Sequence, residues 1–283
     1  MSIQKLLNIK INNPETQTFL ADAYYQNSEK KLPLIVFAHG YKGYKDWGAW
    51  DLMAEKFAEA GFYFVKFNFS HNGTTLEHPT EFGDLEAFGN NNFSKEMSDF
   101  KTVISHFEKE ERVNAENISI IGHSRGGGIA VIEAYEDKRV KNLITFAGVS
   151  NFDIRFPRKE KLQQWKEDGV MFSENKRTHQ KMPHYFQYYE DYTTNKQRFT
   201  IQLAAQNLKK PYLIVQGNED EAVNEKEALL LHKWCKSSEL LMVENGDHTF
   251  GTQEPWLGNE LPEKMSFIIE STIDFVNKNT KLN

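Results

Sequence analysis

The sequence predicts an α/β protein with a mostly parallel twisted sheet, helices on both faces and a small helical cap insertion. Two observations support this fold class. Short apolar runs typical of buried strands alternate four times with stretches of helical periodicity, and the connections between them are short. Residues 32–38 form a continuous apolar run, which is typical of a strand covered on both faces. Functional groups of such a sheet gather at the carboxyl ends of its strands.

The first half of the chain begins with two expected strands, 3–11 and 18–25, in an antiparallel hairpin that turns near Asn13-Pro14. A helix is expected over 51–60, where apolar residues recur at helical spacing and Gly61 is a stop signal. A polar loop over about 70–92 precedes an expected amphipathic helix over 94–111. The other strands expected here are 32–38, 62–69, 118–121 and 142–148.

The alternation stops at Val149. Residues 150–207 are polar, charged and aromatic, and they form too long and too aromatic a stretch for a plain connection or for disorder. We expect no strand there, but a helical cap, or lid, over the strand ends. The sheet then resumes with strands at 211–216 and 239–243 and helices at 225–236 and 262–277. The predicted division is therefore a core of 1–149 and 208–283 with a cap of 150–207.

One stretch has the pattern G-x-S-x-G: Gly122-His123-Ser124-Arg125-Gly126. An isoleucine-rich run precedes it and a helical pattern follows it, so Ser124 is expected at a sharp strand-to-helix corner with its hydroxyl exposed. Glycine suits both flanks because a side chain there would collide with the neighbouring strand or helix. A glycine-rich turn without any chemistry is the alternative interpretation.

A serine hydroxyl is a poor nucleophile at neutral pH and needs a base, which in turn needs an orienting carboxylate. Asp220 and His248 each follow an expected strand. Because parallel strands bring their carboxyl ends to one edge, we predict that Ser124, His248 and Asp220 meet as a triad. The alternative acids are Glu219, Glu221 and Asp247.

A tetrahedral intermediate carries a negative oxygen that needs two hydrogen-bond donors. The backbone N–H of Arg125, at a helix start, is expected to supply one of them. The N–H of Tyr41, in the loop His39-Gly40-Tyr41, is expected to supply the other, because Gly40 lets the backbone turn inward. A plain connecting loop is the alternative interpretation.

The substrate pocket is expected between this loop and the inner face of the cap. Its expected lining is His39, Gly40, Trp165, Tyr185 and Tyr188. The cap aromatics either pack against one another or form an apolar acyl or aryl pocket, and both hold if the lid is the pocket wall. The side chain of Arg125 either binds a substrate carboxylate or packs aside, for example in a surface pair.

Composition narrows the remaining function classes. The chain of 283 residues is 39% hydrophobic and 26% charged, which is typical of a globular protein with a large core. A net charge of −6 with dispersed basic residues predicts no nucleic-acid partner. We recognise neither a signal peptide nor a transmembrane window, and the single Cys235 fits a reducing compartment, so we expect a cytoplasmic protein without a membrane partner. No cofactor and no metal is expected, since the spacing of His39, His71, His78 and Asp84 matches no compact metal motif.

Four motifs in this order resemble the α/β-hydrolase superfamily: His39-Gly40, Gly122 to Gly127, Gly217 to Val223 and Gly246-Asp247-His248. The chain is similar to the dienelactone-hydrolase-like and cinnamoyl (feruloyl) esterase branch, which is related to serine aminopeptidases, over about residues 18–277. The resemblance implies the α/β-hydrolase fold. Dienelactone hydrolases proper have a cysteine where this chain has Ser124, and prolyl peptidases carry a large N-terminal domain for which we expect no room here.

The expected function is a serine hydrolase that cleaves carboxylic esters of small or medium substrates through an acyl-enzyme. Ser124 attacks, His248 acts as base and then as acid, and Asp220 orients His248. The alternatives are an amidase or peptidase for short peptides, an acyltransferase with the same triad, and a binding protein without catalysis. The expected partner is a small-molecule ester or amide. The oligomeric state is left open, with a homodimer among the options.

Overall fold

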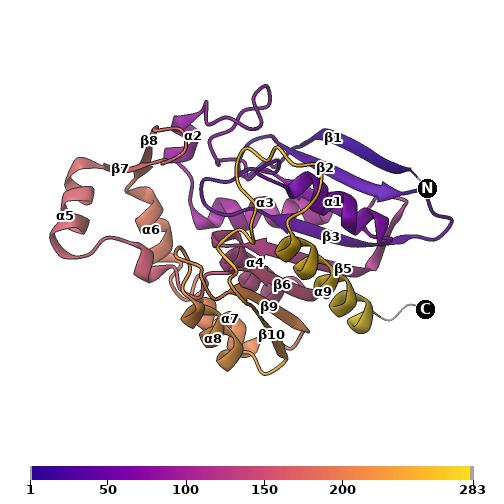
Figure 1. The fold of residues 1–283 in the computed structure, drawn as a ribbon. Helices are drawn as coiled ribbons and strands as arrows, with labels where there is room; N and C mark the ends of the chain where they lie inside the picture. The colour runs from indigo at the N-terminus through magenta and orange to yellow at the C-terminus, as the bar shows by residue number, and fades with distance from the viewer. Residues whose placement is uncertain (1, 281–283) are drawn as a thin grey trace.

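A computed structural model describes residues 2–280 and contains one eight-stranded twisted sheet in the order β1-β2-β4-β3-β5-β6-β9-β10 (Figure 1). The pairs β1–β2 and β2–β4 are antiparallel, and the other neighbouring strands run parallel. The mostly parallel sheet and the antiparallel N-terminal hairpin are thus confirmed. The strands are β1 (Ile3–Ile11), β2 (Phe19–Gln26), β3 (Leu32–Ala38), β4 (Tyr63–Phe67), β5 (Val113–His123), β6 (Val140–Phe146), β9 (Tyr212–Gly217) and β10 (Ser238–Val243).

Helices cover both faces of this sheet. On one face pack α1 (Trp50–Glu59) and α9 (Glu263–Asn279), and on the other α3 (Phe93–Phe107), α4 (Arg125–Glu136) and α8 (Glu225–Trp234). Side chains of β3 alternate between the two cores: Leu34 and Val36 belong to the core under α3 and α4, whereas Ile35 and Phe37 belong to the core under α1 and α9. The apolar run of β3 therefore reflects burial on both faces, as predicted.

The insertion between β6 and β9 corrects one expectation, because it contains strands. β7 (Val170–Glu174) and β8 (Lys181–Tyr185) form an antiparallel hairpin, among α5 (Lys159–Asp168), α6 (Gln187–Thr194) and α7 (Ile201–Asn207). Each strand has five residues that mix charged and polar side chains with apolar ones, so neither shows a clear period of two. Their cross-strand pairing, from Val170–Tyr185 to Glu174–Lys181, is a tertiary feature that no single run displays.

Two further boundaries differ from the expectation. The polar loop over 70–92 contains a short helix, α2 (Leu85–Gly89), whose first turn is capped by Asp84 accepting a 2.8 Å hydrogen bond from the Ala87 N–H. β5 begins at Val113, not Ile118, because residues 113 and 114 pair with the start of β3 before a register shift. Neither difference alters which strands lead into the site.

Aromatic residues of the insertion pack onto the main core through Phe93 of α3. The rings of Phe93 and Phe152 are stacked with centroids 4.0 Å apart, and Tyr188 and Phe199 also contact Phe93. Figure 1 shows α5, β7 and β8 projecting beyond one end of the sheet. Within residues 2–280, the helices lack the combination of length and apolarity that a bilayer crossing requires.

Candidate active site

Ser124 occupies the corner between β5 and α4. Its φ of 55° and ψ of −120° are strained for a residue with a side chain, as expected for a nucleophile on a strand-to-helix turn. The corner is tight: a Cβ on Gly122 would lie 2.3 Å from the Gly126 oxygen, and a Cβ on Gly126 would lie 2.4 Å from the His39 oxygen. Glycine is therefore required on both sides of the serine.

Asp220 is the acid that reaches the histidine. The Nδ1 of His248 lies 2.8 Å from Asp220 Oδ2, and the Asp220 side chain is fully buried. The same carboxylate accepts 2.8 Å hydrogen bonds from the N–H groups of Ala222 and Val223, and one of 3.0 Å from Gln216 Nε2. Burial opposes its charge, but the His248 contact and these backbone donors together hold the pKa of Asp220 below its usual value.

The alternative acids do not take this place. Glu219 and Glu221 are exposed, and so is Asp247, whose Oδ1 accepts hydrogen bonds from the N–H groups of Thr249 and Gly251. Asp247 therefore shapes the loop that carries His248 instead of contacting its ring.

The loops after β9 and β10 meet at two glycines. A Cβ on Gly217 would lie 2.1 Å from the Gly246 oxygen, so the two backbones touch where a side chain would hold them apart. The N–H of Glu219 donates to that same oxygen at 2.9 Å. This approach is what lets Asp220 reach His248 across 28 residues of sequence.

Ser124 and His248 line the same two cavities. Among the described residues no hydrogen bond joins the Ser124 hydroxyl to His248, as in many ligand-free sites whose catalytic contacts tighten on substrate binding. The ring of His123 holds the histidine loop in place: its Nε2 lies 2.9 Å from the His248 carbonyl oxygen, and the two ring centroids are 4.8 Å apart. Burial, with the neighbouring His248, lowers the pKa of His123 to about 3, so this ring is neutral.

The predicted oxyanion donors flank the serine. A Cβ on Gly40 would lie 2.9 Å from the Ser124 Cβ, so the loop after β3 passes directly beside Ser124. In residues 2–280 neither the Tyr41 N–H nor the Arg125 N–H has a protein hydrogen-bond partner, and the latter begins α4. Both donors are thus free for a ligand.

The larger cavity, of about 520 Å³, lies between this loop and the insertion. Its lining includes Tyr41, Arg125, Arg155, Phe156, Met171, Ser173, His184, Tyr188 and Val223 besides Ser124 and His248. Of the expected pocket residues, Tyr188 lines this cavity, while His39 and Gly40 line the smaller one of about 110 Å³. The structure therefore places the pocket wall partly on the hairpin β7–β8, which the sequence did not indicate.

Trp165 and Tyr185 correct the expected lining, because neither borders these cavities. Trp165 is buried inside the insertion, where its Nε1 donates to the His184 carbonyl at 2.7 Å. The Tyr185 hydroxyl points the other way and donates to Glu86 of α2. An aromatic side chain in a lid can lie on its inner or its outer face, and composition alone does not distinguish the two.

Two expected roles are refined by burial. His39 is buried, its Nδ1 lies 2.8 Å from the Gly40 oxygen, and its Nε2 accepts from the Phe69 N–H at 3.3 Å, so it supports the loop. Burial lowers its pKa to about 4. The Arg125 guanidinium forms a buried ion pair with Glu96 at 2.8 Å and lies 5.0 Å from the Tyr188 ring centroid, so it packs aside in an internal pair, not a surface one.

Sequence reasoning missed His123, Ser173 and His184. His123 lies inside the G-x-S-x-G motif, yet its contact with the His248 carbonyl depends on a loop 125 residues away. Ser173 and His184 belong to the unrecognised hairpin. A period-two signal in 170–174 and 181–185 was the only cue available, and it was weak.

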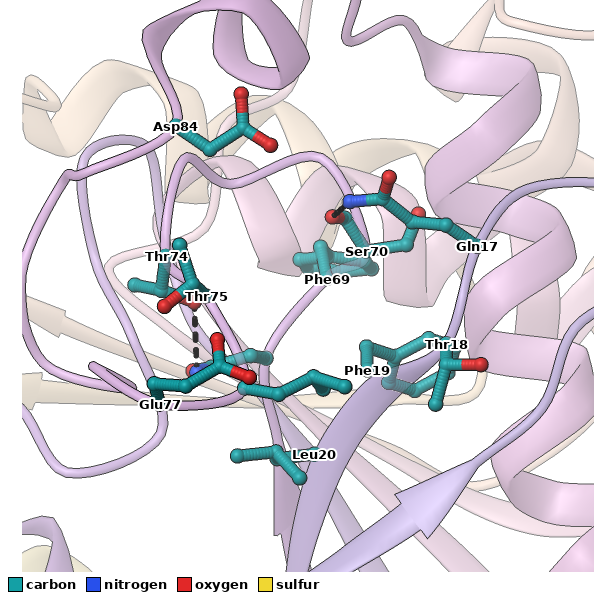
Figure 2. A pocket seen from close by; sticks show the side chains of 12 residues that line it. Gln17, Thr18, Phe19, Leu20, Phe69, Ser70, Thr74, Thr75, Glu77 and Asp84 are labelled. Atoms are coloured by element: carbon teal, nitrogen blue, oxygen red, sulfur yellow. Dashed lines mark hydrogen bonds between the residues drawn. The ribbon is translucent and has the colours of Figure 1, made fainter.

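Another cavity, of about 410 Å³, lies near the start of β2 and is lined by none of the predicted triad residues. Figure 2 shows Glu77 and Asp84 approaching it from one chain segment, with Gln17, Thr18 and Phe19 on the other side. Gln17 closes part of the rim by donating from Nε2 to the Ser70 oxygen. Two carboxylates in this lining disfavour an anionic ligand.

Three carboxylates come close enough together to suggest a metal site, with oxygen atoms of Asp22, Asp46 and Asp51 within 4.8 Å of one another. The ammonium group of Lys66 already contacts all three, at 2.9 Å for Asp22 and 2.6 Å for Asp51. Lys45 contacts Asp22 at 2.7 Å as well. The ammonium groups of two lysines therefore already occupy the space between these carboxylates and offset most of their charge. The histidines weighed as ligands from the sequence are not part of this group.

A family model for the prolyl oligopeptidase family matches residues 51–272. The chain belongs to this family. Among curated proteins, an uncharacterized 31.7 kDa protein of the traX-finO intergenic region of Escherichia coli is 30% identical over 124 residues, 44% of this chain and 40% of that protein. The match thus spans less than half the length of this curated relative.

Solved structures show the fold over the whole chain. Est1E from Butyrivibrio proteoclasticus has a TM-score of 0.71 at 16% identity, covering 97% of this chain and 99% of its own, and a second Est1E structure holds ferulic acid. A puromycin-hydrolyzing peptidase of Mycobacterium tuberculosis has a TM-score of 0.66 at 13% identity, covering 99% of this chain and 40% of its own. This member of the prolyl oligopeptidase family therefore has the α/β-hydrolase fold that its motifs suggested.

Proposed function

We propose that this protein is a serine hydrolase that cleaves carboxylic esters of small or medium substrates through an acyl-enzyme. The observation that carries the proposal is the buried Asp220–His248 pair at 2.8 Å, whose imidazole borders the same cavities as the strained Ser124. A carboxylate on Nδ1 leaves Nε2 free to act as the base toward the serine.

The proposed reaction follows from these positions. Ser124 Oγ attacks the ester carbonyl while His248 takes its proton, and Asp220 stabilises the imidazolium that results. The N–H groups of Tyr41 and Arg125 hold the negative oxygen of the tetrahedral intermediate. His248 then protonates the leaving alcohol. In the second half of the reaction His248 takes a proton from water, the water oxygen attacks the acyl carbonyl, and His248 returns the proton to Ser124 as the carboxylic acid leaves.

The cavity supports a substrate of limited size. A volume of about 520 Å³, bordered by Phe156, Tyr188, Met171 and Val223, suits an apolar or aromatic acyl group. The ferulic acid bound to Est1E is a ligand of this kind, although the likeness of Est1E to this chain concerns the fold. An aromatic acyl ester is therefore the first substrate to examine.

An amidase or peptidase acting on short peptides is the second candidate. Membership of the prolyl oligopeptidase family favours it, and one structural neighbour is a puromycin-hydrolyzing peptidase. The same triad and oxyanion donors would serve, because amide hydrolysis differs chiefly in the leaving group that His248 must protonate.

The deciding variant is Ser124→Ala. We expect kcat for p-nitrophenyl acetate to fall by roughly 10³-fold or more, with an unchanged thermal unfolding curve, because the nucleophile acts as a unit with its base. A panel of matched p-nitrophenyl esters and aminoacyl p-nitroanilides, run on the wild type, separates the two candidates. Full activity in a well-folded Ser124→Ala protein would refute both, and failure of a fluorophosphonate probe to label Ser124 would point to a binding role.

A further inference from the structure

The loop after β3 is fastened to the hairpin β7–β8 through Tyr41. Its hydroxyl lies 2.7 Å from Ser173 Oγ and 2.7 Å from His184 Nε2, and these two atoms are 3.2 Å apart. The next residue, Lys42, donates from Nζ to the Glu174 carbonyl at 2.7 Å. Two consecutive residues of the loop are thus held by a segment 132 residues further along the chain.

The protonation states of these side chains determine which atom donates and which accepts in each hydrogen bond. Burial, followed by the positive charges of Arg125 and Lys42, lowers the pKa of His184 to about 3, so the ring is neutral at working pH. Burial raises the pKa of Tyr41, so its hydroxyl keeps its proton. With the His184 proton on Nδ1, Ser173 donates to the Tyr41 oxygen and Tyr41 donates to His184 Nε2.

The loop needs such an anchor because one of its residues has a strained backbone conformation. Tyr41 and Lys42 are the central residues of a turn closed by the Gly43 N–H donating to the Gly40 oxygen at 3.1 Å. Lys42 has a φ of 56°, in the left-handed region that disfavours lysine. Residues 39–43 are themselves in no helix or strand, so contacts from outside the turn are needed to keep Lys42 in this conformation.

We infer that Ser173 and His184 are positioning residues that hold the backbone N–H of Tyr41 where it meets the negative oxygen of the reaction. The inference rests on the proposed function and deepens it. It makes the hairpin of the insertion part of the oxyanion site, so turnover depends on the insertion even for an ester too small to touch it. Displacement of the donor by about 1 Å is enough to cost about a hundredfold in rate.

The test uses the full chain with Tyr41→Phe, His184→Phe and the double variant. For p-nitrophenyl acetate we expect kcat to fall about 10- to 100-fold with KM changed less than about twofold, since the contact acts in the transition state. A trifluoromethyl ketone forms an oxyanion on Ser124, and its inhibition constant should increase by the same factor. The kcat of the double variant should equal that of the less active single variant, because each substitution breaks the same chain of hydrogen bonds.

Two further variants separate positioning from simple structural support. In His184→Gln the amide oxygen can still accept from the Tyr41 hydroxyl, so kcat should be much closer to wild type than in His184→Phe. Gln180→Met removes another hydrogen bond between the insertion and the core, from Gln180 Nε2 to the Phe82 oxygen at 2.9 Å, and should leave kcat and the inhibition constant unchanged.

Unchanged kcat and inhibition in a folded Tyr41→Phe protein would overturn the inference, as would additive losses in the double variant or an equal loss in Gln180→Met. If His184→Phe does not fold, Ser173→Ala combined with Tyr41→Phe provides the same cycle. A failure of the proposed function would be recognised by a different result, namely activity that is retained in Ser124→Ala.

Discussion

Asp220 shows how a single residue is selected by its surroundings. The sequence offered three other carboxylates for this role, but only Asp220 accepts from two backbone N–H groups, from Gln216 and from the His248 ring. Its lowered pKa keeps it ionised well into the acidic range, so at neutral pH a negative charge faces the His248 ring. The hydrogen-bond donors that surround Asp220 therefore distinguish it from the other carboxylates.

Replacing Asp220 with Asn tests this assignment. The Asn oxygen would occupy the place of Oδ1, next to the two backbone donors, and its NH₂ would face His248 Nδ1 and force the ring into the wrong tautomer. We expect kcat at pH 7 to fall by roughly 10³- to 10⁴-fold, measured on the ester that the wild type cleaves best.

Asp247→Asn is the matched control, since its amide oxygen can still accept from the Thr249 and Gly251 N–H groups. It should keep wild-type kcat. A reversal of these two results would transfer the orienting role to Asp247.

At the scale of elements, helix α4 combines two demands. Its first residues form the nucleophile corner, and its middle is buried against the sheet, where Glu133 lies among Ile129, Val131 and Ile132. One oxygen of Glu133 is buried and has no hydrogen-bond partner among residues 2–280. Burial, together with the charges of Asp137 and Glu136, raises the pKa of Glu133 to about 8, against weaker opposition from Arg198 and Lys101.

Glu133 should make the free energy of unfolding depend on pH. The pKa of Glu133 in the folded state is above the usual glutamate value of 4.5, so the folded state keeps a proton that the unfolded state releases. Stability from this group is therefore complete below about pH 4.5 and declines as the pH rises to about 8, by a few kcal/mol in total. Urea unfolding at pH 5, 7 and 9 should show Glu133→Gln close to wild type at pH 5 and more stable at pH 9.

Glu160→Gln is the control, because Glu160 is exposed on α5 and is not one of the charges that act on Glu133. It should retain the wild-type decline with pH. A Glu133→Gln protein with an unaltered pH profile would show that this carboxyl is solvated and ionised in the fold.

At the scale of the whole molecule, a buried ion network joins the antiparallel and parallel parts of the sheet. Lys66 on β4 contacts Asp22 on β2, Asp51 on α1 and Asp46 on the loop between β3 and α1. Burial opposes the charge of Lys66, but its three carboxylates together raise its pKa. The backbone N–H of Lys45, next to Asp46, donates to Asn68 Oδ1 at 2.6 Å. The loop between β3 and α1 is therefore held by this hydrogen bond as well as by the ion pairs.

Lys66→Met should destabilise the protein by about 3–5 kcal/mol, because it leaves the buried Asp22 and the half-buried Asp46 to share the one ammonium group of Lys45. The measurement is the midpoint of urea unfolding at pH 7. Lys56→Met removes an exposed i,i+3 pair with Glu59 and should cost less than about 1 kcal/mol. Equal effects of the two substitutions would mean that the network is hydrated and contributes little.

The sequence by itself determined the elements whose cause is local. The apolar run 32–38 indicated a strand buried on both faces, the helix over 51–60 ended near Gly61, and Gly122 to Gly126 indicated the corner that carries Ser124. These features depend on side-chain period, on backbone sterics and on turn chemistry within a few residues, so they are legible in one stretch of chain.

Only the tertiary structure decided which side chains meet. It selected Asp220 over its neighbours, directed Arg125 to Glu96, turned Trp165 and Tyr185 away from the pocket, and brought the hairpin to Tyr41. Each of these outcomes joins segments between about 20 and 140 residues apart, and depends on how closely two loops approach or which face of a short strand is covered. Such contacts arise from packing, which no local period encodes.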